Sequence, residues 1–333
     1  MVTDIAKQVI YIWLVNLFYN IVQFNNQVNM KTYFNILYIY ILMGTTGYSQ
    51  QDAQYTQYMY NTIMINPAYA GSRGTTSIFG MYRQQWVGLD GAPVTVMLSV
   101  NTPHKNEKIG LGLSFTNDRI GPSSENNFSM DFSYTIQPSQ RYKISFGLKA
   151  TANLFSLDIN KLNILQQGDP QFQNLNMDFS PNVGAGIYVH SDNTYFGFSV
   201  PNFLETKHYK DNSVSVTKER LHYYFITGHT FDFSSELKFK PTLLVKAVEG
   251  APIQVDLSGN FLISDKLTLG VGYRWDAAVS ALAGFQVSDS WFIGYAYDAE
   301  TSRLANYNSG SHEIFLRYEF FNNYNRVLTP RFF

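Results

Sequence analysis

The stretch Leu267-Thr-Leu-Gly-Val-Gly-Tyr-Arg-Trp275 alternates, residue by residue, between apolar side chains and small or polar ones. Successive side chains of a strand point to opposite faces, so the odd positions form one apolar face that ends in two aromatic residues. The opposite face carries Arg274, whose charge needs water or a partner. A strand with one apolar and one hydrated face is typical of a barrel that contacts lipid outside and water inside.

The same alternation recurs along the chain after residue 73. Between Ile253 and Ile263, for example, Asp256 and Asn260 fall on the face opposite the apolar one. We therefore predict an all-β fold, a transmembrane antiparallel β-barrel of about fourteen strands and of the outer-membrane type. The predicted strands are 74–83, 92–101, 108–117, 126–136, 142–155, 181–190, 194–200, 220–232, 237–247, 252–263, 266–275, 278–287, 290–298 and 312–320.

The connections between these strands indicate an orientation. Outer-membrane barrels have short periplasmic turns and longer outer loops. Every predicted connection longer than eight residues follows an odd-numbered strand, although two connections of that set are short. The pattern predicts outward long loops and periplasmic N- and C-termini. The odd-numbered connections are 84–91, 118–125, 156–180, 201–219, 248–251, 276–277 and 299–311.

The region before the first strand resembles a secretory signal followed by a short polar segment. Residues 30–49 combine Lys31, an apolar stretch and a small or polar end, which predicts a signal peptide cleaved between Ser49 and Gln50. Residues 1–29 are interpreted as an over-called start or an extra segment, with a membrane anchor as the alternative. We expect residues 50–73 at the periplasmic mouth or inside the lumen. The barrel then covers 74–320, and a periplasmic tail covers 321–333.

Composition excludes several classes of protein. Charged residues are only 15% of the chain, aromatic residues are 16%, and the mean hydropathy is −0.16, too polar for a bundle of membrane helices. The formal net charge of −1 gives no reason to expect nucleic acid as a partner. The chain has no cysteine, which excludes disulfides, thiolate metal sites, cysteine nucleophiles and a lipoprotein anchor.

No constellation of residues predicts an enzyme, a cofactor or a metal. The six histidines are scattered, and neither HExxH nor GxSxG occurs. Ser311-His312 at the start of the last strand is the one pair compatible with an outer-membrane hydrolase, and a solvated rim pair is the simpler interpretation. The glycine pairs Gly110/Gly112 and Gly184/Gly186 lack a nucleotide loop and favour a crowded lumen instead.

Charged residues at inward positions are the candidates for a lumen function. They either pair across the lumen and fix the shape of the barrel, or line a cavity for a passenger peptide. Three tryptophans near strand ends, Trp86, Trp275 and Trp291, are typical of the aromatic girdle at the membrane interface. The candidate lumen charges are Lys149, Lys246, Asp256, Arg274, Asp276, Asp298, Arg317 and Glu319.

Several motifs, in order along residues 50–333, resemble the PorP/SprF family of type IX secretion system membrane proteins. The family's opening is similar to Gln51-Asp-Ala-Gln-Tyr-Thr-Gln-Tyr-Met59 and Ile65-Asn-Pro-Ala-Tyr-Ala-Gly-Ser72. Tyr82-Arg-Gln-Gln-Trp-Val-Gly-Leu-Asp-Gly-Ala-Pro-Val94 and Tyr307-Asn-Ser-Gly-Ser-His-Glu-Ile314 continue the resemblance. The ending Thr329-Pro-Arg-Phe-Phe333 looks like a variant of the family's Ser-Pro-Arg-Tyr-Phe.

The resemblance implies a non-enzymatic protein of the Gram-negative outer membrane. Members of the family support type IX secretion or surface anchoring of cargo such as gliding adhesins, by engaging C-terminal sorting domains. The implied partners are that cargo, other secretion-system components and outer-membrane lipid. A passive porin or hydrophobic-solute channel is the alternative. The candidate partner or lumen contacts are Arg83, Trp86, Lys246, Asp256, Arg274, Asp298 and Arg317.

Overall fold

A computed structural model describes residues 55–56, 58–106, 108–161, 174–204, 221–249 and 251–320. All of them belong to one compact unit, Tyr48–Phe333. The predicted signal peptide, the residues before it and the C-terminal tail lie outside the described residues. None of the helices in the described ranges is long and apolar enough to cross a membrane.

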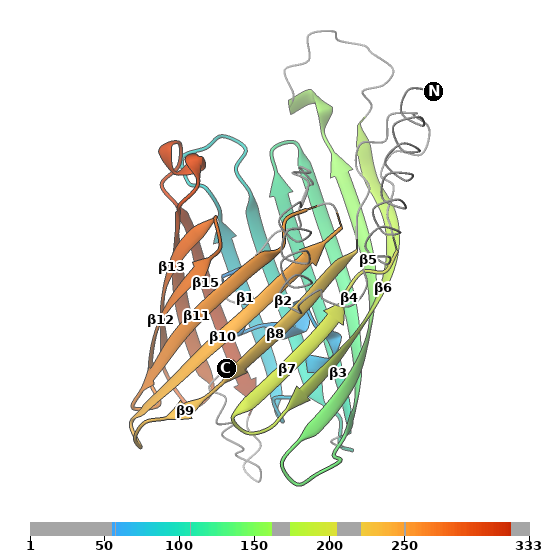
Figure 1. Cartoon of the computed structure of the whole chain (residues 1–333). Helices are drawn as coiled ribbons and strands as arrows, with labels where there is room; N and C mark the ends of the chain where they lie inside the picture. Colours follow the sequence, from blue (N-terminus) through green and yellow to red (C-terminus); the bar gives the residue numbers. More distant parts are fainter. Residues whose placement is uncertain are drawn as a thin grey trace, which may run out of the picture. The chain divides into compact units, whose positions relative to one another are not determined.

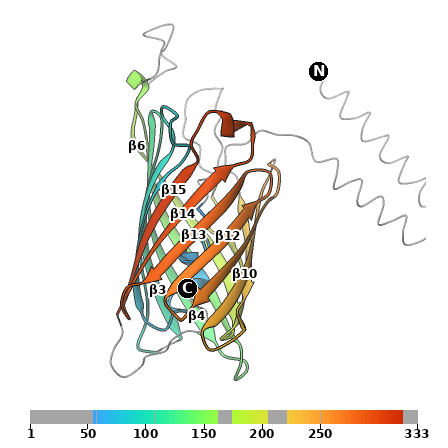
Figure 2. The same ribbon diagram turned by 90° about the vertical axis from the view of Figure 1, so that its left-hand side faces the viewer.

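The strands form one closed antiparallel barrel (Figures 1 and 2). The first strand pairs with the last, and β10 pairs with β11, so the ring has no open edge. The two-residue β9 and the strand β8 both pair with β10, so the barrel has fourteen strand positions. The strands are β1 (Thr76–Gln84), β2 (Val94–Pro103), β3 (Ile109–Ile120), β4 (Ser123–Ile136), β5 (Lys143–Leu157), β6 (Leu175–His190), β7 (Thr194–Val200), β8 (His222–His229), β9 (Phe231–Asp232), β10 (Leu237–Val248), β11 (Gln254–Ile263), β12 (Leu267–Arg274), β13 (Ala278–Gln286), β14 (Trp291–Glu300) and β15 (Ser311–Phe320).

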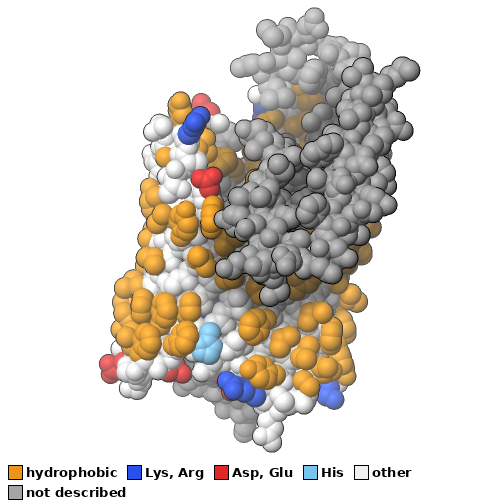
Figure 3. All heavy atoms as spheres, in the orientation of Figure 1, with side chains coloured by type: hydrophobic (Ala, Val, Ile, Leu, Met, Phe, Trp, Pro, Cys, Tyr) orange, Lys and Arg blue, Asp and Glu red, His pale blue; other side chains and the backbone are white. Residues whose placement is uncertain are grey.

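The predicted alternation between an apolar outer face and a polar inner face is confirmed. On β4 and β5, Met130 and Leu148 are 68% and 63% exposed, whereas their neighbours Asp131 and Lys149 are 3% and 5% exposed. Apolar side chains cover much of the outer face in Figure 3. This face suits contact with lipid, because its side chains are apolar and the backbone groups of a closed barrel pair with those of the neighbouring strands.

One predicted loop is largely strand. The expected connection 118–125 is reduced to a two-residue turn between β3 and β4, because Asp118 pairs with Glu125 in a ladder that continues to the turn. Residues 118–125 are mostly polar and do not alternate between apolar and polar side chains, so the sequence pattern could not reveal this part of the ladder. Gly121 makes the turn possible with φ = +54°.

The longer connections gather at one end of the barrel, the top of Figure 1. The strand ends that flank 85–93, 158–174, 201–221 and 301–310 all lie there, and we call it the long-loop end. β1 begins and β15 ends at the opposite end. The arrangement agrees with the predicted parity, and the assignment of the long-loop end to the cell exterior remains a prediction.

The described residues before β1 lie inside the barrel, where the first blue elements of Figures 1 and 2 are seen. We call residues 55–56 and 58–73 the plug. Two 3-10 helices, η1 (Thr62–Met64) and η2 (Pro67–Tyr69), shape it, and Asn66 caps the second through a bond from the Ala68 N–H. Of the two places predicted for this segment, the described part therefore occupies the lumen.

Candidate functional site in the barrel lumen

Glycines of the barrel wall make room for the middle of the plug. Ile63, Asn66 and Ala68 are fully buried, with 0% of their surface exposed. A Cβ added to a wall glycine here would collide with the plug, so the two surfaces are in direct contact. The glycines and the plug residues they meet are Gly110 with Ala70, Gly112 with Ile63, Gly147 with Pro67 and Ala68, and Gly186 with Asn66.

Wall side chains satisfy the backbone carbonyls of the plug. Lys149 Nζ donates to the carbonyls of Ile63 and Met64 at 3.2 and 3.4 Å, while it pairs with Asp131 Oδ1 at 3.1 Å. The hydroxyls of Ser133 and Ser199 donate to the carbonyls of Ala70 and Ile65 at 2.8 and 2.6 Å. Irregular backbone at this depth is stable only where protein groups or water satisfy it, so these bonds fix the plug.

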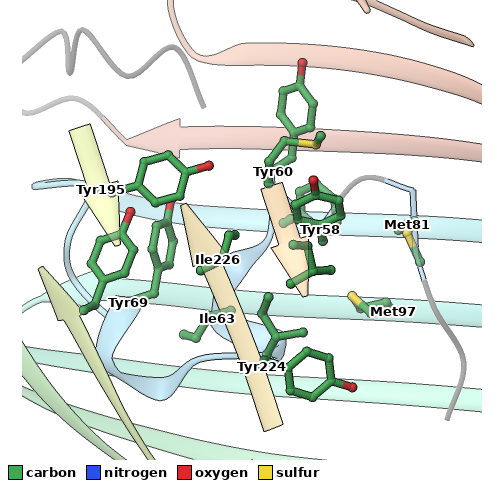
Figure 4. Close-up of a cluster of buried hydrophobic side chains, with 14 of the residues drawn as sticks. Tyr58, Tyr60, Ile63, Tyr69, Met81, Met97, Tyr195, Tyr224 and Ile226 are labelled. Carbon is green, nitrogen blue, oxygen red and sulfur yellow. The ribbon is translucent and has the colours of Figure 1, made fainter. Parts of the chain in front are cut away.

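Aromatic contacts hold the plug against the two sides of the wall. The ring of Tyr60 lies 5.4 Å from that of Phe292 and 4.8 Å from that of Phe315, both of which point into the lumen. Tyr69 meets Tyr188 edge to face at 5.5 Å. Figure 4 shows four plug residues, Tyr58, Tyr60, Ile63 and Tyr69, gathered with side chains of the wall.

Tyr58 adds a polar contact to this cluster. Its hydroxyl lies 3.0 Å from Thr242 Oγ1 on β10. Burial raises the pKa of the Tyr58 hydroxyl to about 12, so the group stays neutral at physiological pH.

The first described residues of the plug bind a buried group of charges near the long-loop end. Arg83 donates to Asp298 Oδ2 at 2.8 Å and to Glu313 Oε2 at 3.0 Å. Thr56 donates its backbone N–H to Glu313 at 3.2 Å and its hydroxyl to Asp298 at 2.6–2.7 Å. We call Arg83, Asp298 and Glu313 the Arg83 cluster; their side chains are at most 2% exposed.

Further ion pairs line the lumen. Arg274 Nε lies 2.9 Å from Asp256 Oδ1 across β11 and β12. Near the start of β1, Arg73 Nε donates to Glu319 at 2.6 Å, and Arg317 lies 3.7 Å from the same carboxylate. Such pairs cross-link neighbouring strands and join the plug to the wall.

A pocket remains between the plug and the wall formed by β11, β12 and β13. Thr56, Tyr58 and Met59 form its plug side, and the wall side includes the Asp256–Arg274 pair. Gly272 faces this space, where an added Cβ would make only ordinary contacts of 3.4 Å or more. The plug therefore fits the wall less closely here than over the glycines of β3, β5 and β6.

Trp86 belongs to the loop region and not to the lumen. Its indole N–H donates to Glu300 Oε1 at 2.7 Å, and its backbone N–H donates to the Ser311 hydroxyl at 3.1 Å. The residue adopts φ = +49°, which is uncommon for a side chain of this size. Hydrogen bonds between Val87 and residues 309–310 join loop 85–93 to loop 301–310. Trp275 and Trp291 are exposed, as a girdle requires.

The structure brings most of the predicted lumen residues together but not all of them. Arg83, Lys246, Asp256, Arg274, Asp298 and Arg317 are buried in the lumen, and Lys246 Nζ lies 5.9 Å from the ring centre of Tyr224. The prediction of a lumen position for Asp276 is wrong, since it is exposed in the turn after β12. Thr56, Arg73, Asp131 and Glu313 also line the lumen and were not predicted, although inward alternation along β4 and β15 indicates the last two.

Among the described residues, the histidines do not lie together in a metal-binding or catalytic arrangement. No group of three potential metal ligands occurs there. Ser311 is buried, whereas the ring of His312 bonds the Tyr295 hydroxyl at 2.6 Å and that hydroxyl lies on the exposed, outer face. The two neighbours therefore point to opposite sides of β15, which does not suit a catalytic pair.

Comparisons with known proteins give a family for this architecture. The model of the type IX secretion system membrane protein PorP/SprF family matches residues 47–318. No curated protein sequence matches the chain. Among solved structures, the chain is similar to the CymD monoaromatic hydrocarbon channel, with 11% identity, a TM-score of 0.48, and coverage of 84% of this chain and 95% of that one. It is also similar to a Pseudomonas aeruginosa FadL homologue, with 13% identity, a TM-score of 0.38, and coverage of 74% and 89%.

Proposed function

Because the chain belongs to the PorP/SprF family of type IX secretion system membrane proteins, we propose that it supports the secretion or surface anchoring of cargo proteins. In this proposal it engages the C-terminal sorting domains of cargo, such as gliding adhesins, at the outer membrane. The family match over residues 47–318 is the observation that carries the proposal. The apolar outer face of a closed barrel supports lipid as its surroundings.

The plug inside the lumen favours this role over that of a passive porin. A porin needs a continuous aqueous path, whereas here the plug packs against glycines of β3, β5 and β6 and reaches the Arg83 cluster near the long-loop end. The outer-face position of His312 likewise favours a non-enzymatic protein, since it faces away from Ser311.

The loops at the long-loop end support a role in holding a partner. Val87 ties loop 85–93 to loop 301–310, and Trp86 ties it to the adjoining ends of β14 and β15, so its shape is fixed before any partner arrives. A loop that is already ordered loses less conformational entropy when it binds. We propose that these two loops help to receive the cargo or another component of the secretion system.

Deletion of the gene, followed by measurement of cargo at the cell surface, tests the proposal. We expect proteins with a C-terminal sorting domain of one class to be lost from the surface, and wild-type complementation to restore them. Outer-membrane proteins without such a domain serve as the control. Normal secretion and retention of every sorting-domain cargo in the deletion strain would refute the proposal. Steady open channels in planar bilayers would favour the porin instead.

A further inference from the structure

Thr56 occupies a polar site that three residues of the barrel wall build around it. Its N–H and its hydroxyl each donate to a different carboxylate of the Arg83 cluster, and Arg83 Nη1 lies 3.1 Å from its hydroxyl oxygen. Glu313 is 0% exposed and Asp298 is 1% exposed. Buried carboxylates are costly unless hydrogen-bond donors satisfy them, and Thr56 adds two donors to those of Arg83, so an occupant that offers donors stabilises the site.

The chemistry of the site suits a peptide. The cluster carries two carboxylates and one guanidinium, so it favours an occupant with N–H and O–H groups and disfavours an acidic one. Arg83 Nε, buried in the same cluster, has no hydrogen-bond partner within the described part of the chain. Thr56 therefore leaves one donor of the site unused. An extended segment with a Ser or Thr offers the N–H, the hydroxyl and a carbonyl that this donor could bind.

The surroundings of Thr56 allow such an exchange. The pocket against β11, β12 and β13 adjoins Thr56, Tyr58 and Met59. The middle of the plug, by contrast, lies on the wall glycines without free space. Asp298 and Glu313 also lie near the ends of β14 and β15 that join at the long-loop end, so the site is within reach of a segment that enters there.

We propose that the Arg83 cluster is a binding site for an extended peptide segment that carries Ser or Thr. Thr56 fills the site in this structure, and a guest segment takes it by displacing Tyr55–Tyr60. The inference rests on the proposed function in one respect, namely that the guest would belong to a cargo protein. It adds the location of the site and the residue types, Ser and Thr, that the site recognises.

A peptide with the chain's own sequence from Gln50 to Tyr60, carrying a fluorophore, is the probe. It is added to the full-length barrel in nanodiscs, and binding is followed by fluorescence anisotropy. The Thr56→Val barrel should bind it about tenfold more tightly than the wild type, because the built-in competitor has lost a hydrogen bond to a charged group. A peptide with Thr56→Val should bind this barrel about tenfold more weakly, and a peptide with Thr56→Ser should bind like the original.

Two further variants complete the test. Thr62→Val removes a buried plug hydroxyl that donates to the Tyr58 carbonyl at 3.3 Å and lies outside the Arg83 cluster, and it should leave the peptide affinity at the wild-type value. Asp298→Asn in the Thr56→Val barrel should weaken peptide binding. Equal affinity of the two peptides, or equal affinity of the Thr56→Val and Thr62→Val barrels, would overturn the inference. The assay contains no cargo, so its failure leaves the proposed function standing, and normal secretion in the deletion strain leaves the peptide site standing.

Discussion

Replacing Gly147 by alanine is expected to loosen the plug, because the new methyl group would enter the space of the Pro67–Ala68 backbone. Backbone atoms held by neighbouring bonds cannot move aside as the end of a flexible side chain can. Overpacking of a well-packed core costs about 1–3 kcal/mol, and the upper part of that range applies to a collision with backbone. We therefore expect the free energy of unfolding to fall by about 3 kcal/mol. If the plug leaves the wall instead, the collision does not occur and this cost is avoided.

Gly272→Ala is the matched control. It also lies on the inner face of a strand, but its new Cβ would make ordinary contacts of 3.4 Å or more beside the pocket. We expect the free energy of unfolding to change by no more than about 0.5 kcal/mol, since no neighbouring atom has to move. The assay is denaturant unfolding of the barrel in detergent, followed by tryptophan fluorescence, together with limited proteolysis of residues 55–73. Equal midpoints and equal protease resistance of the two variants would refute the reasoning.

Three other changes probe different parts of the molecule. Leu148→Arg, on the outer face of β5, should cost roughly 2–4 kcal/mol if that face meets lipid, measured by unfolding in liposomes against the conservative Leu148→Met; an equal stability would argue against a lipid-facing position. Arg83→Met leaves Asp298 and Glu313 without their guanidinium and should cost about 3–5 kcal/mol in the same unfolding assay, and a neutral effect would show that the cluster adds no stability. Deleting residues 55–70 should convert a closed barrel into one with steady conductance in planar bilayers, whereas unchanged conductance would mean that other groups close the lumen.

The strands could be predicted from the sequence because two environments meet at the barrel wall. Met130 and Asp131 are neighbours in sequence, yet one is exposed on the outer face and the other is buried in the lumen. Period-two alternation records this difference directly. The ladder between Asp118 and Glu125 could not be predicted because Ile120 is its one apolar residue before the turn, too few to show the alternation that marks a strand.

The place of the plug could be predicted only in part. Its sequence showed that it was neither a strand nor a simple tail, and the glycine pairs suggested a crowded lumen. The fit itself depends on which strands the closed barrel brings around it, since Gly110, Gly147 and Gly186 come from β3, β5 and β6. Spacing along the chain does not contain that information. The partners of Thr56 were missed for the same reason, because they lie 242 and 257 positions away in the sequence.

The two halves of the plug differ in how closely they pack against the glycines of the wall, and this difference decides how the plug could open. From Ile63 to Ala70 the plug lies on glycine, so close packing against the wall adds to the hydrogen bonds from Lys149, Ser133 and Ser199. At Thr56 and from Tyr58 to Tyr60 it is held by hydrogen bonds and ring contacts beside the pocket. Hydrogen bonds can be exchanged for equivalent bonds to another molecule, whereas close packing has no such substitute. Opening of the lumen should therefore begin at Thr56 and stop at Ile63, which confines the path of a guest to the side formed by β11, β12 and β13.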